Sequence, residues 1–293
     1  MIIYIKNKYI NMNKKINKIS FYFNSDNKKA VNLYNKIKSF IINKYPKISF
    51  DDSHPDVILV LGGDGAMIKA VKKFNYINSL FFGLNLGNTG FLTSVRDHKK
   101  FMVSIDNLLK GNFFISPRNL IKTEVIRDKK IIFSDDVLNE VAIQNLVGMV
   151  KAEVKINDFP FQNIFGTGVL VSTPTGSTAY NLSAHGPLVM PNINCFILTE
   201  LMDHNIPTPS LIVSKNEKIT IDIIDFRIKE IFQIKQNDKY LGCDVALISD
   251  GINVLSLKKR DKIIVVNNTK KIYLVELEHN YFLKSLKEKF YKK

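Results

Sequence analysis

Asp56–Gly65 reads DVILVLGGDG, in which a continuous apolar run ends in glycines around one aspartate. The run from 56 to 61 predicts a strand buried on both faces, and Ala66–Phe74 predicts the helix that follows it. A strand followed by a helix indicates an α/β layer with parallel pairing. Ligands of such sheets bind beyond the carboxyl ends of the strands, where glycines let backbone N–H groups approach phosphate oxygens. We therefore expect a phosphate or ribose site at this turn.

The aspartate inside the turn predicts phosphoryl transfer. The turn matches neither familiar phosphate loop, since Ile68 stands where the dinucleotide fingerprint needs glycine and no GxxxxGK[ST] occurs. Phosphates repel a carboxylate among such amides unless it binds Mg²⁺ or accepts a proton from an attacking hydroxyl. Asp64 is accordingly the candidate catalytic residue, although an aspartate that bonds its own backbone in a tight turn would look the same.

The alternation of strands and helices extends on both sides of this stretch. The sequence predicts strands at Lys18–Phe23 and Leu80–Leu84 and helices at Lys28–Asn43 and Asp97–Lys110, the last ended by Gly111. We place an α/β N-terminal domain at residues 1–118 on this basis.

From residue 119 the sequence is rich in short β-branched or alternating segments. They lie near 121–126, 131–133, 137–143, 151–156, 168–172, 211–213, 218–224, 262–267 and 272–276. Turns such as Ser249-Asp250-Gly251 separate them. This texture predicts an all-β, sandwich-like second domain at residues 119–293, which ends in a lysine-rich helix near Asn280–Tyr291.

A second glycine-rich stretch, Gly83–Leu92, also follows a predicted strand. It should form the neighbouring wall of the same crevice. Its Phe91 is the kind of side chain that packs on adenine, although an aromatic residue of this kind is more often core.

Two polar stretches follow in the β-rich region. Val171–Ser183 carries five hydroxyl side chains within seven residues, and Ser177 or Thr178 is predicted to cap a short helix. That arrangement suits a ribose or a phosphate. The Asn139-Glu140 pair is a weak signal alone, because neighbours on a strand point to opposite faces unless a bulge intervenes.

Composition limits the class of protein. With 293 residues, 45% hydrophobic and 24% charged, the chain should fold as an ordinary globular protein, with two domains preferred over one. Cys195 and Cys243 form no CxxC, and the histidines show no HExxH, so neither a disulfide framework nor a zinc site is indicated. Lysines at 6 and 8 interrupt the apolar core that a signal peptide would need at this point. No apolar run is long enough to span a bilayer. We expect a cytoplasmic protein without a membrane partner.

The formal net charge of +15 is the unusual bulk property. Such a surface attracts nucleic acid, anionic lipid or phosphorylated small molecules. Lysine is spread over the whole chain, however, and no stretch interleaves dense basic residues with aromatic ones as a base-stacking platform requires. We expect no nucleic-acid partner, and a basic nucleic-acid-binding protein remains an alternative.

The four stretches together resemble the NAD kinase family. That family's pattern is a GGDG loop, an N-x-G-x-x-G-F-L loop, an N-E pair and a T-G-S-T-A-Y-x-x-S-A-G-G-P run, in this order. The chain offers Gly62–Gly65, Asn85–Leu92, Asn139-Glu140 and Thr175–Pro187. The last run is the most specific, because lipid kinases of the diacylglycerol or sphingosine type share the GGDG loop. Such a lipid kinase is the nearest alternative.

The resemblance implies a two-domain NAD kinase-like architecture and an ATP-dependent phosphorylation of the adenosine ribose 2′-hydroxyl of NAD, which gives NADP. Asp64 would be the base or orienting group, and Gly62, Gly63 and Gly65 would face the donor phosphates. The implied NAD-binding residues are Asp64, Gly65, Phe91, Asn139, Glu140, Thr178, Ala179, Tyr180, Asn181, Leu182 and Ser183. A divalent metal ion, Mg²⁺ in the first instance, ATP and a homo-oligomer, dimer or tetramer, are implied as well.

Three positions depart from the family pattern. Thr167-Gly168 stands where the family has Asp-Gly, His185 replaces the first glycine of Gly-Gly-Pro, and Ile252 replaces a glutamine. A neutral hydroxyl thus occupies the place of a carboxylate that the resemblance assigns to the nicotinamide half. We expect looser binding of that half.

Overall fold

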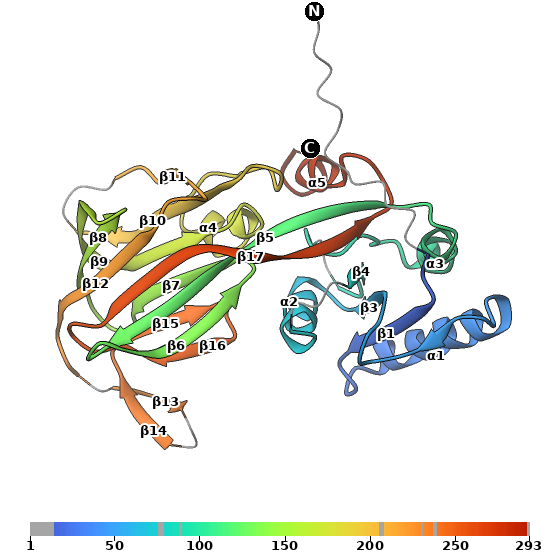
Figure 1. Cartoon of the computed structure of the whole chain (residues 1–293), viewed down its shortest axis with the longest axis horizontal. Coiled ribbons are helices and arrows are strands. Elements are labelled where there is room, and N and C mark those ends of the chain that lie inside the picture. Colours follow the sequence, from blue (N-terminus) through green and yellow to red (C-terminus); the bar gives the residue numbers. More distant parts are fainter. Residues whose placement is uncertain are drawn as a thin grey trace, which may run out of the picture. The chain divides into compact units, whose positions relative to one another are not determined.

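The computed structural model describes residues 15–75, 79–87, 90–204, 208–229, 231–236 and 239–291. The chain, drawn in Figure 1, divides into two compact units. Unit 1 comprises Met1–Arg118 and Lys271–Lys293, and unit 2 comprises Asn119–Lys270. The end of the chain thus belongs to unit 1, whereas the predicted division gave every residue after 118 to the second domain. The predicted domain boundaries themselves stay a prediction.

Unit 1 is built on a parallel sheet with the strand order β2-β1-β3-β4-β17. Its strands are β1 (Lys18–Phe23), β2 (Ser49–Phe50), β3 (Val57–Leu61), β4 (Leu80–Leu84) and the last residues of β17 (Lys262–Glu276). All neighbouring strands in this order pair in parallel. The helices are α1 (Lys28–Lys44), α2 (Asp64–Lys73), the 3-10 turn η1 (His98–Lys100) and α3 (Phe101–Leu109). The predicted α/β N-terminal region is confirmed.

Capping side chains decide where two of these helices begin. The Asn27 side chain accepts the N–H groups of Lys29 and Ala30 at 3.0 and 3.3 Å, so α1 starts where predicted. The Asp97 side chain accepts the N–H of Lys99 at 3.0 Å and starts η1 rather than an α-helix. The helix predicted from Asp97 onward is therefore split into η1 and α3.

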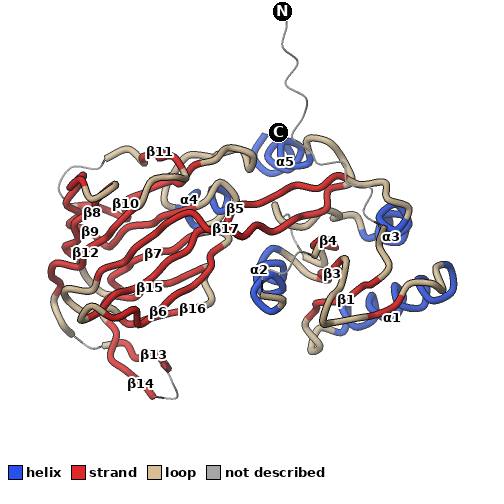
Figure 2. The backbone as a smooth tube through the Cα atoms, in the orientation of Figure 1, coloured by secondary structure: helices blue, strands red, loops and turns tan. Residues whose placement is uncertain are grey.

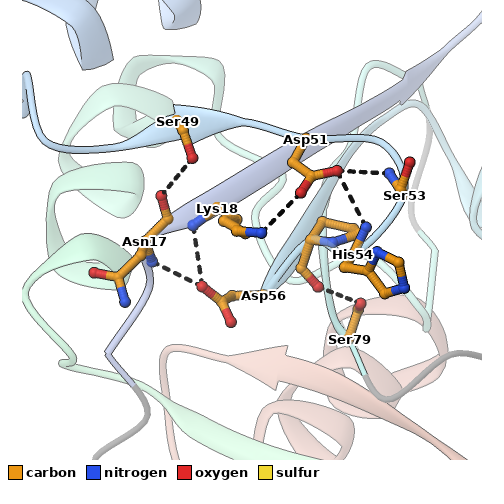
Figure 3. Close-up of polar contacts among 9 residues, drawn as sticks. Asn17, Lys18, Ser49, Asp51, Ser53, His54, Asp56 and Ser79 are labelled. Carbon is orange, nitrogen blue, oxygen red and sulfur yellow. Dashed lines mark hydrogen bonds and ion pairs between the residues drawn. The ribbon is translucent and has the colours of Figure 1, made fainter.

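An aspartate also fixes the edge of the sheet at which the strands begin (Figure 3). Asp56 lies just before β3, and its Oδ2 accepts the N–H groups of Asn17 and Lys18 at 2.8 and 3.0 Å. The neighbouring Asp51 forms an ion pair with Lys18 at 3.0 Å. Each partly exposed hydrogen bond of this kind contributes about 1 kcal/mol. Asp56 therefore helps to set the register of β1 against β3 at the edge opposite the glycine turn.

Unit 2 consists mostly of strands, which Figure 2 shows in red. They are β5 (Phe114–Arg127, shared with unit 1), β6 (Lys130–Val137), β7 (Glu140–Asn145), β8 (Val150–Ile156), β9 (Phe159–Ser172), β10 (Cys195–Asp203), β11 (Leu211–Ser214), β12 (Ile219–Phe226), β13 (Phe232–Gln236), β14 (Lys239–Cys243), β15 (Val245–Ser249), β16 (Asn253–Ser256) and the first part of β17. The main order is β16-β15-β7-β9-β8-β12-β17, and β13 and β14 form a separate hairpin. The predicted β-rich C-terminal region is confirmed.

Some strands of unit 2 differ from the prediction. β10 was not predicted, because its sequence CFILTELMD is largely apolar without the alternation that marks a strand. Strands β13 to β16 were missed as well. The segments predicted at 262–267 and 272–276 form the single strand β17, since the polar residues NNTKK at 267–271 interrupt the apolar pattern without ending the strand.

The last residues that the structure describes form a short helix that belongs to unit 1. It consists of α5 (Tyr281–Leu286) and a π-helical turn, η3 (Lys287–Tyr291), which together match the helix predicted near Asn280–Tyr291. Tyr281, Phe282 and Ser285 are buried. Among the helices that the structure describes, none is long and apolar enough to cross a membrane.

Candidate active site

The GGDG turn joins the end of β3 to the start of α2. Gly63 is the N-cap residue, and because glycine has no side chain, it cannot cap the first amides of the helix. A Cβ added at Gly62 would meet the Ala66 Cβ at 2.5 Å, so helix packing requires this glycine. A Cβ added at Gly65 would meet no described atom within 4 Å, so packing within the chain does not require that one. Open space beside helix N-terminal amides fits a phosphate group.

Two backbone amides hold the Asp64 carboxylate at the first position of α2. Its Oδ2 accepts the N–H of Phe91 at 2.7 Å, and its Oδ1 accepts the N–H of Leu92 at 3.0 Å. A Cβ at position 90 would collide with the same carboxylate, so Gly90 is required for this approach. Each oxygen keeps lone-pair capacity for a further donor. The carboxylate is thus fixed in orientation and still able to accept a proton.

The two glycine-rich stretches lie side by side, as predicted. β3 and β4 pair in parallel with Leu61 opposite Leu84, and the N–H of Gly62 donates to the carbonyl of Leu84 at 3.0 Å. The two turns therefore leave the sheet at the same edge. Asn88 and Thr89 of the second stretch lie outside the described residues.

Phe91, the candidate for adenine packing, is covered by the C-terminal helix. Its ring centroid lies 5.8 Å from that of Phe282 and 6.2 Å from that of Phe290, and the Lys289 ammonium lies 4.8 Å from it. The side chain is 4% exposed. Its packing is that of a core residue in unit 1, and a contact with NAD stays a prediction.

In unit 2 the Asn139-Glu140 pair meets the hydroxyl-rich stretch. Glu140 begins β7 and pairs with Ser172 at the end of β9. The N–H of Thr173 donates to the carbonyl of Asn139 at 2.8 Å, and a Cβ at Gly176 would collide with that carbonyl. Two stretches that are separated in sequence therefore lie against each other in this unit.

Asp250, which the sequence predicts only as a turn residue, orients the pair. Its carboxylate accepts the N–H groups of Leu138 at 2.9 Å and Asn139 at 2.7 Å, and its own N–H donates to the Glu140 carbonyl at 3.0 Å. The Asp250-Gly251 turn was the available signal, because aspartate in turns often accepts backbone amides.

Two acceptors beside this turn have no partner among the described residues. They are Oδ1 of Asn139 and Oε2 of Glu140, both buried. Burial raises the pKa of Glu140 to about 8, and the charge of Asp250 adds to this, whereas the N–H of Tyr180 acts in the opposite direction. Near pH 7 the Glu140 carboxyl is therefore mostly protonated. Buried polar atoms without partners mark places where a ligand can complete the hydrogen bonding.

The remaining predicted residues lie in the 3-10 turn η2 (Gly176–Thr178), in α4 (Tyr180–Ser183) and at Ala179 between them. Thr178, Ala179, Tyr180 and Leu182 are half-buried, and Ser183 is exposed. Asn181 is wholly buried, donates to the carbonyl of Pro187 at 3.0 Å and accepts the Thr199 hydroxyl at 2.9 Å. It holds the turn within unit 2, and its contact with NAD stays a prediction.

The predicted cap of this short helix is wrong. The residue before α4 is Ala179, and no side chain caps the helix. The Ser177 hydroxyl donates to the carbonyl of Pro174 at 2.7 Å, and the Thr178 hydroxyl donates to that of Thr175 at 3.3 Å. These bonds to preceding carbonyls stabilise the turn itself instead of the helix start.

The structure shows the local contacts and backbone conformation of the three residues that depart from the family pattern. The Thr167 hydroxyl donates to the carbonyl of Leu201 at 2.7 Å, so it is engaged with the main chain. His185 follows α4 with φ +60, a left-handed conformation that favours glycine. Ile252 is 37% exposed and bonds the carbonyl of Ser249 through its N–H at 3.0 Å.

Each unit thus carries groups suited to a phosphate or a nucleoside. Unit 1 has a fixed carboxylate beside helix N-terminal amides at the carboxyl edge of a parallel sheet. Unit 2 has buried acceptors beside a hydroxyl-rich turn. These features define a phosphotransferase that acts on a nucleotide or sugar hydroxyl.

Comparisons with known proteins identify the family. The model of the ATP-NAD kinase N-terminal domain matches residues 5–113, and that of the ATP-NAD kinase C-terminal domain matches residues 134–241. The chain is 30% identical over 236 residues to the NAD kinase of Natranaerobius thermophilus, across 80% of this chain and 77% of that one. The chain belongs to the NAD kinase family.

Two solved structures share the fold. Yeast NADH kinase complexed with NADH matches with a TM-score of 0.83 and 18% identity, over 94% of this chain and 88% of that one. An NAD kinase from Archaeoglobus fulgidus in complex with ATP matches with a TM-score of 0.67 and 18% identity, over 92% and 96%. None of these comparisons supports the lipid kinase or the nucleic-acid-binding alternative.

The raised pKa of Glu140 predicts a pH-dependent cost to stability. Between about pH 4.5 and pH 8 the unfolded chain releases the Glu140 proton while the folded protein keeps it, so the stabilisation is present at low pH and lost as pH rises through this window. We expect Glu140→Gln to gain roughly 4 kcal/mol in unfolding free energy over the original protein between pH 5 and pH 8.5. Urea unfolding at both pH values measures this. Glu200→Gln, on β10, is the control, and parallel pH profiles for Glu140→Gln and the original protein would contradict the assignment.

The left-handed conformation at position 185 predicts a stabilising substitution. His185→Gly should raise the unfolding free energy by about 0.5 kcal/mol, since relief of the αL penalty exceeds the entropy that glycine adds to the unfolded chain. His185→Ala, which keeps the Cβ, should bring no gain. Thermal unfolding of the three proteins gives the comparison, and equal midpoints for glycine and alanine would count against it.

Proposed function

We propose that this chain transfers the γ-phosphoryl group of ATP to the 2′-hydroxyl of the adenosine ribose of NAD, which gives NADP. Membership of the NAD kinase family supports the acceptor, as does the NADH in the yeast relative. The ATP in the Archaeoglobus relative supports the donor. The observation that carries the chemistry is the Asp64 carboxylate, fixed by two amides at the start of a helix.

Asp64 would orient the attacking hydroxyl and accept its proton late in the reaction. A ribose hydroxyl is hardly ionised near pH 7, and the transition state for phosphoryl transfer is loose. Most of the acceleration therefore comes from alignment and from neutralised charge. A carboxylate held by the amides of Phe91 and Leu92 has one orientation in which to offer its remaining lone pairs.

The donor phosphates would bind at the N-terminus of α2. Amides at Gly63 and Gly65 lie at or near the positive end of the helix dipole. The open space beside Gly65 leaves room for a ligand that a side chain would exclude. Gly62 would contribute to this loop through its packing on the helix.

The adenosine part of NAD would bind to the surface made by Asn139, Glu140 and the η2–α4 turn. The unpartnered Oδ1 of Asn139 accepts a hydroxyl or amino donor. Glu140, protonated near neutral pH, can both donate and accept. Such a pair reads the hydroxyl and amino groups of a nucleoside. Thr178, Tyr180 and Ser183 would line the same surface.

A divalent cation, Mg²⁺ in the first instance, fits this scheme only as a partner of the donor. In the part of the chain that the structure describes, no three His, Cys, Asp or Glu side chains gather as a ligand set. Mg²⁺ commonly keeps waters and binds substrate phosphates with one or two carboxylates. Bound in that way, it would neutralise charge on the phosphates, and Asp64 would be its carboxylate ligand.

Assembly and location belong to this proposal as well. Family resemblance supports a homo-oligomer, a dimer or tetramer, whose neighbouring subunit completes the NAD site. The expected location is the cytoplasm. Size-exclusion chromatography with light scattering measures the assembly directly.

Replacement of the carboxylate should stop the reaction. Asp64→Asn is expected to lower the rate of NADP formation at least about a hundredfold, because the variant cannot accept the proton. NAD affinity should stay within a few fold. The asparagine side chain also places its NH₂ group opposite one of the two N–H donors, which removes that hydrogen bond. Hydrogen exchange of the Phe91 and Leu92 amides should therefore be measured together with turnover.

Asp97→Asn is the matched control, because Asp97 also sits at a helix start in unit 1 and asparagine caps equally well. It should keep normal turnover. Near-normal NADP formation by Asp64→Asn would overturn the assigned role. Labelled ATP offered with NAD and with diacylglycerol tests the function itself, since phosphorylated lipid without NADP would contradict the proposal.

A further inference from the structure

The C-terminal helix contacts residues 90–96, the segment that orients Asp64. Arg96 donates through Nη2 to the carbonyl of Gly90 at 2.7 Å, and its Nη1 pairs with Glu288 of η3 at 2.7 Å. The same guanidinium donates to the Ser285 hydroxyl and lies 5.2 Å from the centre of the Tyr281 ring. All of these residues belong to unit 1. One side chain therefore joins the glycine loop to the C-terminal helix.

Other contacts join the same two segments. The Tyr281 hydroxyl donates to the carbonyl of Thr93, and the Ser94 hydroxyl donates to the carbonyl of Val275. The Phe91 ring packs against aromatic rings of α5 and η3. Burial raises the pKa of Tyr281 to about 12, and the nearby charge of Asp64 acts in the same direction. Phe91, Thr93, Ser94 and Arg96 thus all contact residues between 275 and 290.

The Gly90–Phe91 peptide unit links Arg96 directly to Asp64. Its carbonyl accepts from the Arg96 guanidinium at 2.7 Å, and its N–H donates to Asp64 Oδ2 at 2.7 Å. In a trans peptide the carbonyl and the N–H point in opposite directions, so the cation and the carboxylate sit at the two ends of one dipole. Hydrogen bonds in such a chain polarise each other and strengthen. The guanidinium therefore fixes the plane of the peptide that fixes the carboxylate.

We propose that Arg96 is a positioning residue for phosphoryl transfer, and that the C-terminal helix holds it in place through Glu288 and Ser285. The proposal rests on the proposed function, in which Asp64 acts on the ribose hydroxyl. Arg96 acts on Asp64 through the Gly90–Phe91 peptide and touches neither substrate. The helix at the end of the chain thereby sets the catalytic rate.

Arginine suits this role better than lysine. Its planar fork reaches the Gly90 carbonyl, the Glu288 carboxylate and the Ser285 hydroxyl at once, whereas an ammonium on a flexible stem cannot hold the same plane. The pair is partly buried, with 20% of the Arg96 and 32% of the Glu288 side chain exposed, so it is screened less than a surface ion pair. A shift of about 1 Å in a reacting group can cost a hundredfold in rate.

The test compares Arg96→Met with Glu288→Gln in the full chain. Arg96→Met should lower kcat about tenfold or more, with the KM values for NAD and ATP within about threefold, because only the alignment of Asp64 changes. Glu288→Gln keeps the shape and one acceptor, so kcat should fall only about threefold. The double variant should be no slower than Arg96→Met alone, since both act through one chain of contacts. Lys284 of α5 forms an exposed ion pair with Glu278, which precedes that helix, so Lys284→Met is the control and should keep kcat.

Hydrogen exchange supplies a readout that a loss of folding alone would not give. In Arg96→Met the Phe91 and Leu92 amides should exchange about tenfold faster while α1 keeps its protection. Unchanged kcat in Arg96→Met, or a raised KM for ATP at normal kcat, would overturn the proposal, the latter because it places Arg96 on the donor. Global loss of protection would show unfolding, and Glu288→Gln then decides: unchanged kcat in that variant overturns the proposal too. Failure of the unaltered protein to make NADP would instead refute the proposed function.

Discussion

The hydrogen bonds from the Phe91 and Leu92 amides to Asp64 are the constraint on which the proposed chemistry depends. They exist because β3 and β4 pair in parallel and release their turns at one edge of the sheet. Glycine at position 90 is what lets the second turn come close enough. The carboxylate is consequently placed by backbone groups of a rigid sheet edge, and side-chain flexibility contributes little to its position. A catalytic group held in this way needs no reorganisation at the moment of reaction.

The same device recurs in the chain. Asp56 accepts two consecutive amides at the start of β1, Asp64 accepts two in the glycine loop, and Asp250 accepts those of Leu138 and Asn139. In each case a carboxylate that accepts two consecutive N–H groups fixes a stretch of backbone. The first instance sets strand register, the second holds the candidate catalytic residue itself, and the third orients the Asn139-Glu140 pair. One local interaction thus serves both the fold and the site.

Features that depend on neighbouring residues could be predicted from the sequence, whereas contacts between residues far apart in the chain could not. Three features were predicted because each depends on neighbouring residues: the buried run before GGDG, the alternation of strands and helices, and the hydroxyl-rich turn. Arg96 and Glu288 are far apart in the chain, and nothing in either neighbourhood marks their pairing. The membership of the chain end in unit 1 depends on contacts that are equally distant in sequence. Asp250 looked like a turn residue, and only the tertiary fold shows which amides it accepts.

The two units offer complementary chemistry. Unit 1 has backbone donors at a helix start and open space beside Gly65, which suits anionic phosphate oxygens. Unit 2 has buried acceptors on Asn139 and Glu140, which suit hydroxyl and amino groups. A simple phosphate would satisfy only the first set, and a free nucleoside only the second. Since NAD and ATP carry phosphates and nucleosides in one molecule, the presence of both kinds of group in one chain agrees with the NAD kinase family to which the chain belongs.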